Sequence, residues 1–327
     1  KKHLSVFNVF ISELPKMKIE RASERKNDLG EAPHWDWRSS TLIYNDGKRG
    51  EIVRFDPQSK RETEIIRLAG TLGSFPDCRW RDWQHDSLRR RQPQAYGVHG
   101  KWHLYKLDLD TREQTLLAEM LDPDSPVRTR INDGKCDAKG RLWAGTMPRV
   151  FHKKNARGVN NFYCYSKGKV TLKMPQISLS NGIAWTSDNR SMFYNDSIPG
   201  TTYAFDFDLD TGDISNRRVF IDFNRTPGYE HLGFPDGMTM DVNDKIWMAC
   251  FGFGSVIQID PETAKILNTI KVPAKYTTSC CFGGKNYDVL YVTSVSFIGD
   301  ATHPADGFLY QVTELDVKGK AAFEFAG

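Results

Sequence analysis

Short runs of apolar residues recur along the chain and are separated by polar turns. One series of runs begins at Leu42, Leu142, Met192, Ile246 and Leu290, in steps of 100, 50, 54 and 44 residues. The first step therefore spans two periods. Short apolar runs bounded by turn residues are typical of β-strands, and the 3.6-residue periodicity of long amphipathic helices is nearly absent. The pattern predicts an all-β protein made of repeats.

A second series of strand-like runs has the same period. Its markers are Phe55, Leu107, Tyr165, Phe207, Ile259 and Val312, in steps of 52, 58, 42, 52 and 53 residues. Four strands in roughly fifty residues correspond to one propeller blade. We therefore predict a six-bladed β-propeller. A pair of β-sandwiches is the alternative, although it would not require such even spacing.

Two turns in this pattern have the same composition. Asp137 and Asp241 each precede a tryptophan, Trp143 and Trp247, by six residues. Both segments are typical of an Asx turn that leads into a β-strand.

Two segments depart from the repeat. Residues 1–16 precede Met17 and have no place in a first blade, so we expect an extension that is disordered or not native, followed by a single propeller domain over 17–327. Residues 76–98 lack two-residue alternation where a strand is due. A basic loop, a diverged blade edge and a sequence error all remain open for this segment.

Composition and charge exclude several classes of protein. The chain has 327 residues, of which 39% are hydrophobic and 26% charged, and this is ordinary for a globular protein with a sizeable core. Its net charge of +4 is concentrated in residues 1–16 (+2) and 79–91 (+3), so the remainder carries −1. A nucleic-acid surface over 79–91 is therefore a minor alternative, and we expect no nucleic-acid partner.

The sequence also indicates in which compartment of the cell the protein is found. No apolar run approaches the roughly 18–20 residues that span a bilayer, so we expect no membrane association. The six cysteines include no C-x-x-C motif, and Cys280 and Cys281 are adjacent. We therefore expect reduced thiols and a cytoplasmic protein, present as a monomer or weak dimer.

Three polar residues stand in Gly- or Pro-flanked motifs just before, or between, predicted strands. They are Glu31 in Gly-Glu-Ala-Pro, Asn181 in Ser-Asn-Gly and Asp236 in Pro-Asp-Gly. Two carboxylates and an amide oxygen form a hard donor set that suits Ca²⁺, Mg²⁺ or Mn²⁺. Each motif alone is equally typical of a turn residue that hydrogen-bonds its own backbone.

A fourth cluster, residues 130–135, combines a guanidinium, an amide and a carboxylate. Arg130 and Asn132 are two residues apart, so in a strand both face the same side. They could clamp the hydroxyl or carboxylate groups of a small polar substrate. A solvated turn is the alternative.

These motifs together resemble those of the family of regucalcin (senescence marker protein), gluconolactonases and luciferin-regenerating enzymes. The matching text begins near residue 29 and includes the three motifs above, Asn-Asp-Gly-Lys at 132–135 and Ala-Gly-Thr-Met at 144–147. Residues 277–287 and 317–319 look most like the regucalcin branch. The resemblance implies a six-bladed propeller with one divalent metal in its channel.

The resemblance also implies a function. By motif, Glu31, Asn181 and Asp236 correspond to the metal ligands, with Ca²⁺ expected first and Zn²⁺, Mn²⁺ or Mg²⁺ as alternatives. Arg130 and Asn132 correspond to the substrate contacts, and Asp133 is a further candidate. The implied activity is hydrolysis of sugar lactones, with Asp236 as general base. A calcium-binding regulatory protein without significant turnover is the alternative.

One position departs from the family pattern. The residue expected to be a lid glutamate, shortly after Ala-Gly-Thr-Met, is Val150, and residues 151–157 are basic without a carboxylate. Loss of that glutamate predicts a shift of substrate choice towards anionic lactones.

Overall fold

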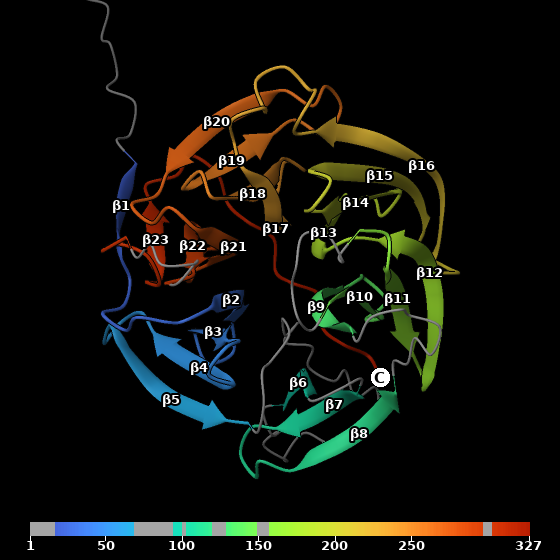
Figure 1. The fold of residues 1–327 in the computed structure, drawn as a ribbon. Helices are drawn as coiled ribbons and strands as arrows, with labels where there is room; N and C mark the ends of the chain where they lie inside the picture. Colours follow the sequence, from blue (N-terminus) through green and yellow to red (C-terminus); the bar gives the residue numbers. More distant parts are fainter. Residues whose placement is uncertain (1–16, 69–93, 100–102, 120–128, 149–156, 297–302) are drawn as a thin grey trace, which may run out of the picture.

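The chain is a ring of β-sheets around a central channel (Figure 1). The structure, a computed structural model, describes residues 17–68, 94–99, 103–119, 129–148, 157–296 and 303–327. Within these ranges it contains 23 β-strands and no helix. The expectation of an all-β propeller is confirmed. In the part of the chain that is described, no helix is long and apolar enough to cross a membrane.

Four blades are antiparallel meanders of consecutive strands, ordered from the channel outward. The first is β2 (Gly30–Asp36), β3 (Thr41–Asp46), β4 (Glu51–Asp56) and β5 (Arg61–Arg67). The second is β9 (Thr129–Cys136), β10 (Leu142–Pro148), β11 (Asn160–Ser166) and β12 (Lys169–Ile177). The third is β13 (Ser180–Trp185), β14 (Ser191–Asp196), β15 (Thr201–Asp208) and β16 (Asp213–Asp222). The fourth is β17 (Phe234–Met240), β18 (Ile246–Phe251), β19 (Ser255–Ile259) and β20 (Ile266–Lys271).

The fifth blade joins the two ends of the described chain. It contains β21 (Thr277–Gly283), β22 (Val289–Ser294) and β23 (Tyr310–Thr313), with β1 (Lys18–Arg21) as its outermost strand. β1 pairs with β23 in antiparallel register, from Lys18 opposite Thr313 to Arg21 opposite Tyr310. This pairing closes the ring and covers an edge that would otherwise be open.

The prediction of six blades is wrong: the described residues form five four-stranded blades. The remaining sheet has three strands, β6 (Gln94–His99), β7 (His103–Asp108) and β8 (Gln114–Glu119). The spacing argument counted Leu107 as a blade marker, but a marker on one strand does not show that its neighbours complete a blade. Of the irregular segment, residues 94–98 belong to β6, whereas 76–93 lie outside the described residues, as does the expected extension 1–16.

The two series of apolar runs are neighbouring strands within each blade. Leu42 lies opposite Phe55, and the equivalent pairs Leu142–Tyr165, Ile246–Ile259 and Leu290–Val312 lie directly opposite each other. All residues of β3 and β10 are buried, because these strands lie between two neighbours in the sheet and between adjacent blades. The outermost β5 instead alternates exposed and partly buried positions over most of its length. Continuous apolar runs therefore mark second strands, as expected for strands covered on both faces.

The predicted Asp–Trp turns are confirmed, and a buried contact explains their spacing. Oδ1 of Asp241 accepts hydrogen bonds from the backbone N–H groups of Asn243 and Lys245, both at 2.9 Å. Its Oδ2 accepts the indole N–H of Trp247 at 2.9 Å. Asp137 and Trp143 make the same contact at 2.8 Å. Each carboxylate thus closes a turn and anchors the tryptophan of the strand that follows.

The cysteines only partly follow the expectation. Cys164, Cys250, Cys280 and Cys281 are free, whereas Cys136 is disulfide-bonded. The prediction of reduced thiols is therefore wrong for Cys136, because cysteines distant in sequence can be joined by the fold and spacing alone does not reveal such a pair.

Candidate active site

The innermost strands surround the channel (Figure 1), and in the five four-stranded blades each of them shifts register with its neighbour, whereas β6 pairs regularly with β7. In β2 the register with β3 shifts between Glu31 and His34, in β13 between Ser180 and Ile183, and in β17 between Pro235 and Met238. β9 and β21 shift at the corresponding places. A bulge bends the strand and re-aims its side chains. Glu31 stands at the start of the bulge in β2, and Asn181 and Asp236 lie inside the bulges of β13 and β17.

The small residues of the motifs allow the inner strands to approach each other. A Cβ atom added to Gly182 would lie 2.6 Å from the carbonyl oxygen of Asp236 and 2.8 Å from the backbone nitrogen of Met238. The glycine after Asn181 is therefore needed for contact between β13 and β17. In β2, Ala32 has φ 47°, a left-handed conformation that is uncommon for a residue with a side chain. This strained turn directly follows Glu31.

Two candidate carboxylates influence each other electrostatically: Asp236 is buried, and Glu31 is half-buried. Burial, followed by the charges of Glu31 and Asp133, holds the pKa of Asp236 well above its ordinary value. Burial, followed by the charge of Asp133, raises the pKa of Glu31 to about 8. Oδ1 of Asp236 is buried and has no hydrogen-bond partner among the described residues. The site therefore contains more negative groups than its own cations balance.

A chain of hydrogen bonds fixes the amide of Asn181. Its Nδ2 donates to Oγ of Ser197 at 2.7 Å, so its Oδ1 is directed away from that contact. Oδ1 accepts a hydrogen bond from Nδ2 of Asn132 at 3.0 Å. Ser197 in turn donates to the carbonyl of Pro235 at 2.6 Å, which links Asn181 to the residue before Asp236.

Arg130 and Asn132 lie in the same site, and their predicted same-side arrangement is confirmed. Nη1 of Arg130 donates to Oδ1 of Asn132 at 3.3 Å and to the carbonyl of Ile131 at 3.0 Å. Burial lowers the pKa of Arg130 to about 10, and the nearby charge of Glu31 partly offsets this shift. Asn132 therefore has a hydrogen bond to each of its neighbours in the site: it accepts one from Arg130 and donates one to Asn181.

Sequence reasoning missed two residues of this site. Ser197 bridges Asn181 and Pro235, and no motif in the sequence marks it. Lys135 donates from Nζ to the carbonyl of Met238 at 2.6 Å, across the channel from β9 to β17. The motif Asn-Asp-Gly-Lys contained this signal, because Asp133 and Lys135 are two residues apart in one strand. Val150, the position of the expected lid glutamate, lies outside the described residues.

The donor set fits a hard divalent cation. In the described ranges no three His, Cys, Asp or Glu side chains are grouped closely enough to hold a metal ion by themselves. The candidate set contains two carboxylates and an amide. Carboxylate and amide oxygens are ligands that Ca²⁺, Mg²⁺ and Mn²⁺ accept. The unpartnered buried oxygen of Asp236 and the mutual repulsion of the acidic groups are both features that a cation would relieve.

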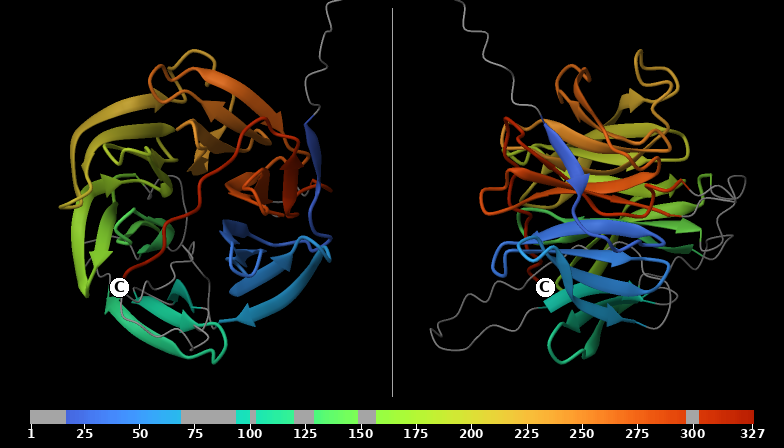
Figure 2. Two further views of the ribbon diagram at one scale, coloured as in Figure 1. Left: turned by 180° about the vertical axis from the view of Figure 1, so that it is seen from behind. Right: turned by 90° about the vertical axis from the view of Figure 1, so that its left-hand side faces the viewer.

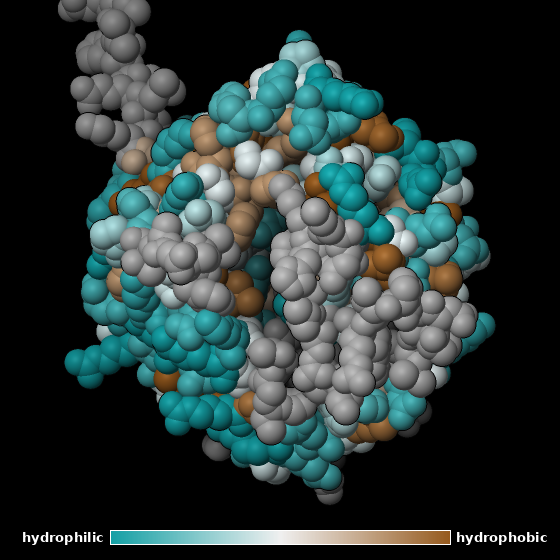
Figure 3. All heavy atoms as spheres, in the orientation of Figure 1, coloured by the Kyte–Doolittle hydropathy of each residue, from teal (hydrophilic) through white to brown (hydrophobic). Residues whose placement is uncertain are grey.

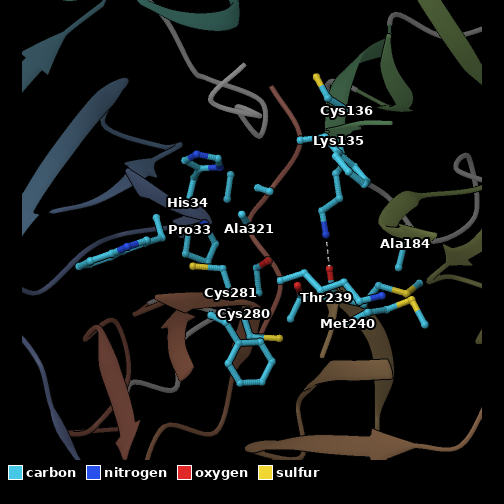
Figure 4. A pocket seen from close by; sticks show the side chains of 18 of the residues that line it. Pro33, His34, Lys135, Cys136, Ala184, Thr239, Met240, Cys280, Cys281 and Ala321 are labelled. Carbon is cyan, nitrogen blue, oxygen red and sulfur yellow. Dashed lines mark hydrogen bonds between the residues drawn. The ribbon is translucent and has the colours of Figure 1, made fainter. Parts of the chain in front are cut away.

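The inner strands also line a chamber of about 110 Å³. Its walls include Pro33, Lys135, Met240 and Cys281, and residues 320–323 of the C-terminal segment contribute to its lining (Figure 4). This segment runs across the face of the ring that is seen from behind in Figure 2. On the opposite face, hydrophilic residues predominate around the rim and the surface is hollowed near the centre (Figure 3).

Comparison with known proteins identifies the family of this chain. The profile of the SMP-30/Gluconolactonase/LRE-like region matches residues 29–296. Regucalcin from Danio rerio is 34% identical over 316 residues, covering 95% of this chain and 99% of that protein. Regucalcin from Xenopus laevis is 33% identical over 320 residues, with the same coverage.

Solved structures agree with this result. A luciferin-regenerating enzyme is 28% identical with a TM-score of 0.83, and the match covers 95% of this chain and 100% of that one. A calcium-binding protein, regucalcin, from Agrobacterium tumefaciens is 27% identical with a TM-score of 0.79, and the match covers 93% and 96%. The predicted resemblance is confirmed, and this chain belongs to the SMP-30/gluconolactonase/LRE-like family.

Proposed function

We propose that this protein hydrolyses sugar lactones with one divalent metal ion held by Glu31, Asn181 and Asp236. The observation that supports the proposal is that each of these three residues stands at a bulge of an inner strand, with a buried Asp236 oxygen that has no hydrogen-bond partner among the described residues. Family membership supports a hydrolase of the gluconolactonase type.

Each residue has a role in this reaction. When bound, the divalent cation polarises the lactone carbonyl and activates water. Asp236 is the general base, and its carboxylate oxygen that does not hold the cation would take a proton from the attacking water. Arg130 donates hydrogen bonds to hydroxyl oxygens of the sugar, because its guanidinium keeps donors beyond those used by Ile131 and Asn132. Asn132 orients the Asn181 oxygen and, with Asp133, borders the substrate.

A calcium-binding regulatory role without significant turnover is the second candidate. The bond between Asn132 and Asn181 favours it, because this contact would support a metal ligand even in the absence of substrate. The similar protein from Agrobacterium tumefaciens is a calcium-binding protein, which is consistent with that role. Both candidates use the same ligands, so turnover discriminates between them.

The test is hydrolysis of a panel of neutral and anionic sugar lactones by metal-stripped protein. Ca²⁺, Mg²⁺, Mn²⁺ and Zn²⁺ are added back separately, and Asp236→Asn is compared with Asp208→Asn, which changes an exposed turn on β15. We expect metal-dependent turnover that falls by about 10²–10⁴-fold in Asp236→Asn, the usual contribution of a general base, and that is unchanged in Asp208→Asn.

Two outcomes would contradict the proposal. Metal binding without turnover of any lactone would favour the regulatory role. Turnover that persists without metal or in Asp236→Asn would show that the reaction uses other residues. Preference for anionic lactones would support the expected effect of Val150.

We further propose that the protein is cytoplasmic and is a monomer or weak dimer. Cell fractionation tests its location, and size-exclusion chromatography tests its oligomeric state.

A further inference from the structure

Side chains from elsewhere in the ring hold three carbonyl groups of the β17 bulge. Ser197 donates to the carbonyl of Pro235, and Nδ2 of Asn195 donates to the carbonyl of Asp236, both at 2.6 Å. Lys135 donates to the carbonyl of Met238, also at 2.6 Å. The bulge interrupts strand pairing between Pro235 and Met238, so side chains replace part of the lost backbone support.

Lys135 differs from the other two donors in direction and in charge. Ser197 and Asn195 lie on or next to β14, in the blade beside β17, whereas Lys135 reaches from β9 and spans part of the channel (Figure 4). Asp236 therefore lies between the carbonyl of Pro235, which Ser197 holds, and the carbonyl of Met238, which Lys135 holds from another blade. A displaced Met238 carbonyl would rotate the adjacent peptide groups of the bulge, and Asp236 lies only two residues before it.

The surroundings of Lys135 make this hydrogen bond important. Within the described residues its ammonium has no carboxylate within 4.0 Å, and its hydrogen bond is the one to Met238. Asp133 is the nearby acidic group, and the free thiols Cys280 and Cys281 also lie near enough to act on its charge. A desolvated ammonium gains more from a short hydrogen bond to a carbonyl than an exposed one does.

We propose that Lys135 is a positioning residue that fixes the β17 bulge across the channel and so orients Asp236 for metal binding. The metal-binding part of this inference rests on the function proposed above. The restraint on β17 does not, since it follows from the contact between Lys135 and Met238.

The variants separate this contact from packing and from charge. Lys135→Met fills a similar volume without a donor. Lys135→Ala leaves space for n-propylammonium, which replaces the missing part of the side chain. Lys320→Met is the matched control, because Lys320 lines the same chamber but pairs with Asp244 instead of a carbonyl of β17.

Two measurements are made on the full chain. The first is Ca²⁺ affinity by titration calorimetry, and the second is amide hydrogen exchange of residues 237–239 in metal-free protein. In Lys135→Met we expect Ca²⁺ affinity to fall about tenfold and exchange to accelerate by a similar factor, as the loss of one charge-assisted hydrogen bond implies. Lys320→Met should stay within about twofold of wild type in both measurements, the usual effect of a surface substitution.

Chemical rescue distinguishes positioning from a packing defect. In Lys135→Ala, n-propylammonium should restore affinity and slow exchange, whereas tetramethylammonium at equal ionic strength should not, because it carries charge without an N–H donor. Unchanged affinity and exchange in Lys135→Met, or equal effects of the two ammonium ions, would overturn the inference. If wild-type protein binds no metal, the proposed function fails, and hydrogen exchange still decides whether Lys135 restrains the bulge.

Discussion

The carboxylate of Asp241 allows a quantitative test of how a repeated turn stabilises the propeller. This side chain is fully buried and accepts four hydrogen bonds. Oδ1 receives two backbone N–H groups, and Oδ2 receives the indole of Trp247 and the amide of Gln258 at 3.1 Å. Asp241→Asn keeps the shape and the Oδ1 acceptor. It replaces Oδ2 with an NH₂ group, which cannot accept a hydrogen bond.

The expected cost follows from the donors that lose their acceptor. The indole of Trp247 is buried, with 1% of its surface exposed, and an unsatisfied buried donor costs about 1–3 kcal/mol. Gln258 is partly exposed and can turn towards water, so its share is smaller. We expect Asp241→Asn to lower the free energy of unfolding by roughly 2–4 kcal/mol, which is large for a substitution of one atom.

The assay is urea denaturation followed by far-UV circular dichroism, with a double-mutant cycle. Trp247→Phe removes the indole donor, so Asp241→Asn should cost less in that background, with a coupling energy of about 1–2 kcal/mol. Asp208→Asn is the control, because Asp208 closes a similar turn through Asp210 and Thr211 but is exposed. Equal effects of Asp241→Asn and Asp208→Asn, or additive effects with Trp247→Phe, would refute the reasoning.

Two further predictions concern the site and its supporting strands. Gly182→Ala places a methyl group against the backbone of Asp236, and a backbone atom cannot move aside as the end of a side chain can. We therefore expect the free energy of unfolding, measured by urea denaturation, to fall by about 1–3 kcal/mol, together with weaker Ca²⁺ binding. Unchanged metal affinity would show that the close approach of β13 and β17 does not position Asp236. The second prediction concerns Asp196, whose pKa is raised to about 6 by burial, although the backbone N–H groups of Ser178 and Leu179 oppose the shift. The folded state holds this proton more tightly, so the stabilisation is complete below the unfolded pKa near 3.8 and is lost as the pH rises to about 6. Unfolding measured from pH 4 to 8 should therefore show a steeper decline over this window in wild type than in Asp196→Asn, in which Glu31, with a pKa raised to about 8, still contributes, and parallel curves would contradict it.

The sequence could predict strands and motifs because both are local properties. The pairs Leu42–Phe55 and Ile246–Ile259 follow from alternation and turn residues that lie within about fifteen positions of each other. The number of complete blades could not be predicted as safely, because completion depends on a strand whose own pattern is irregular. The disulfide of Cys136 was missed for a related reason, since its formation depends on the path of the whole chain.

The candidate site shows the same division between local and distant information. Glu31, Asn181 and Asp236 could be selected because each stands beside a glycine or proline that permits an unusual backbone. Their convergence could not be derived from spacing, because Asn181 and Glu31 are 150 positions apart and meet only when the ring closes. Ser197, which acts through a carbonyl of another strand, has no local signature, and the motif that contains Lys135 does not reveal which carbonyl it contacts.

The bulges explain how a repetitive fold builds one asymmetric site. A regular inner strand directs alternate side chains to its two faces, so the repeat by itself would present similar groups around the channel. A bulge at one level lets each strand direct a different polar residue inward and leaves carbonyls that need outside donors. Neighbouring blades supply these donors through Asn195 and Ser197, and the distant β9 supplies Lys135. Because the acidic groups repel one another within this frame, a cation bound there, as proposed above, would relieve their repulsion.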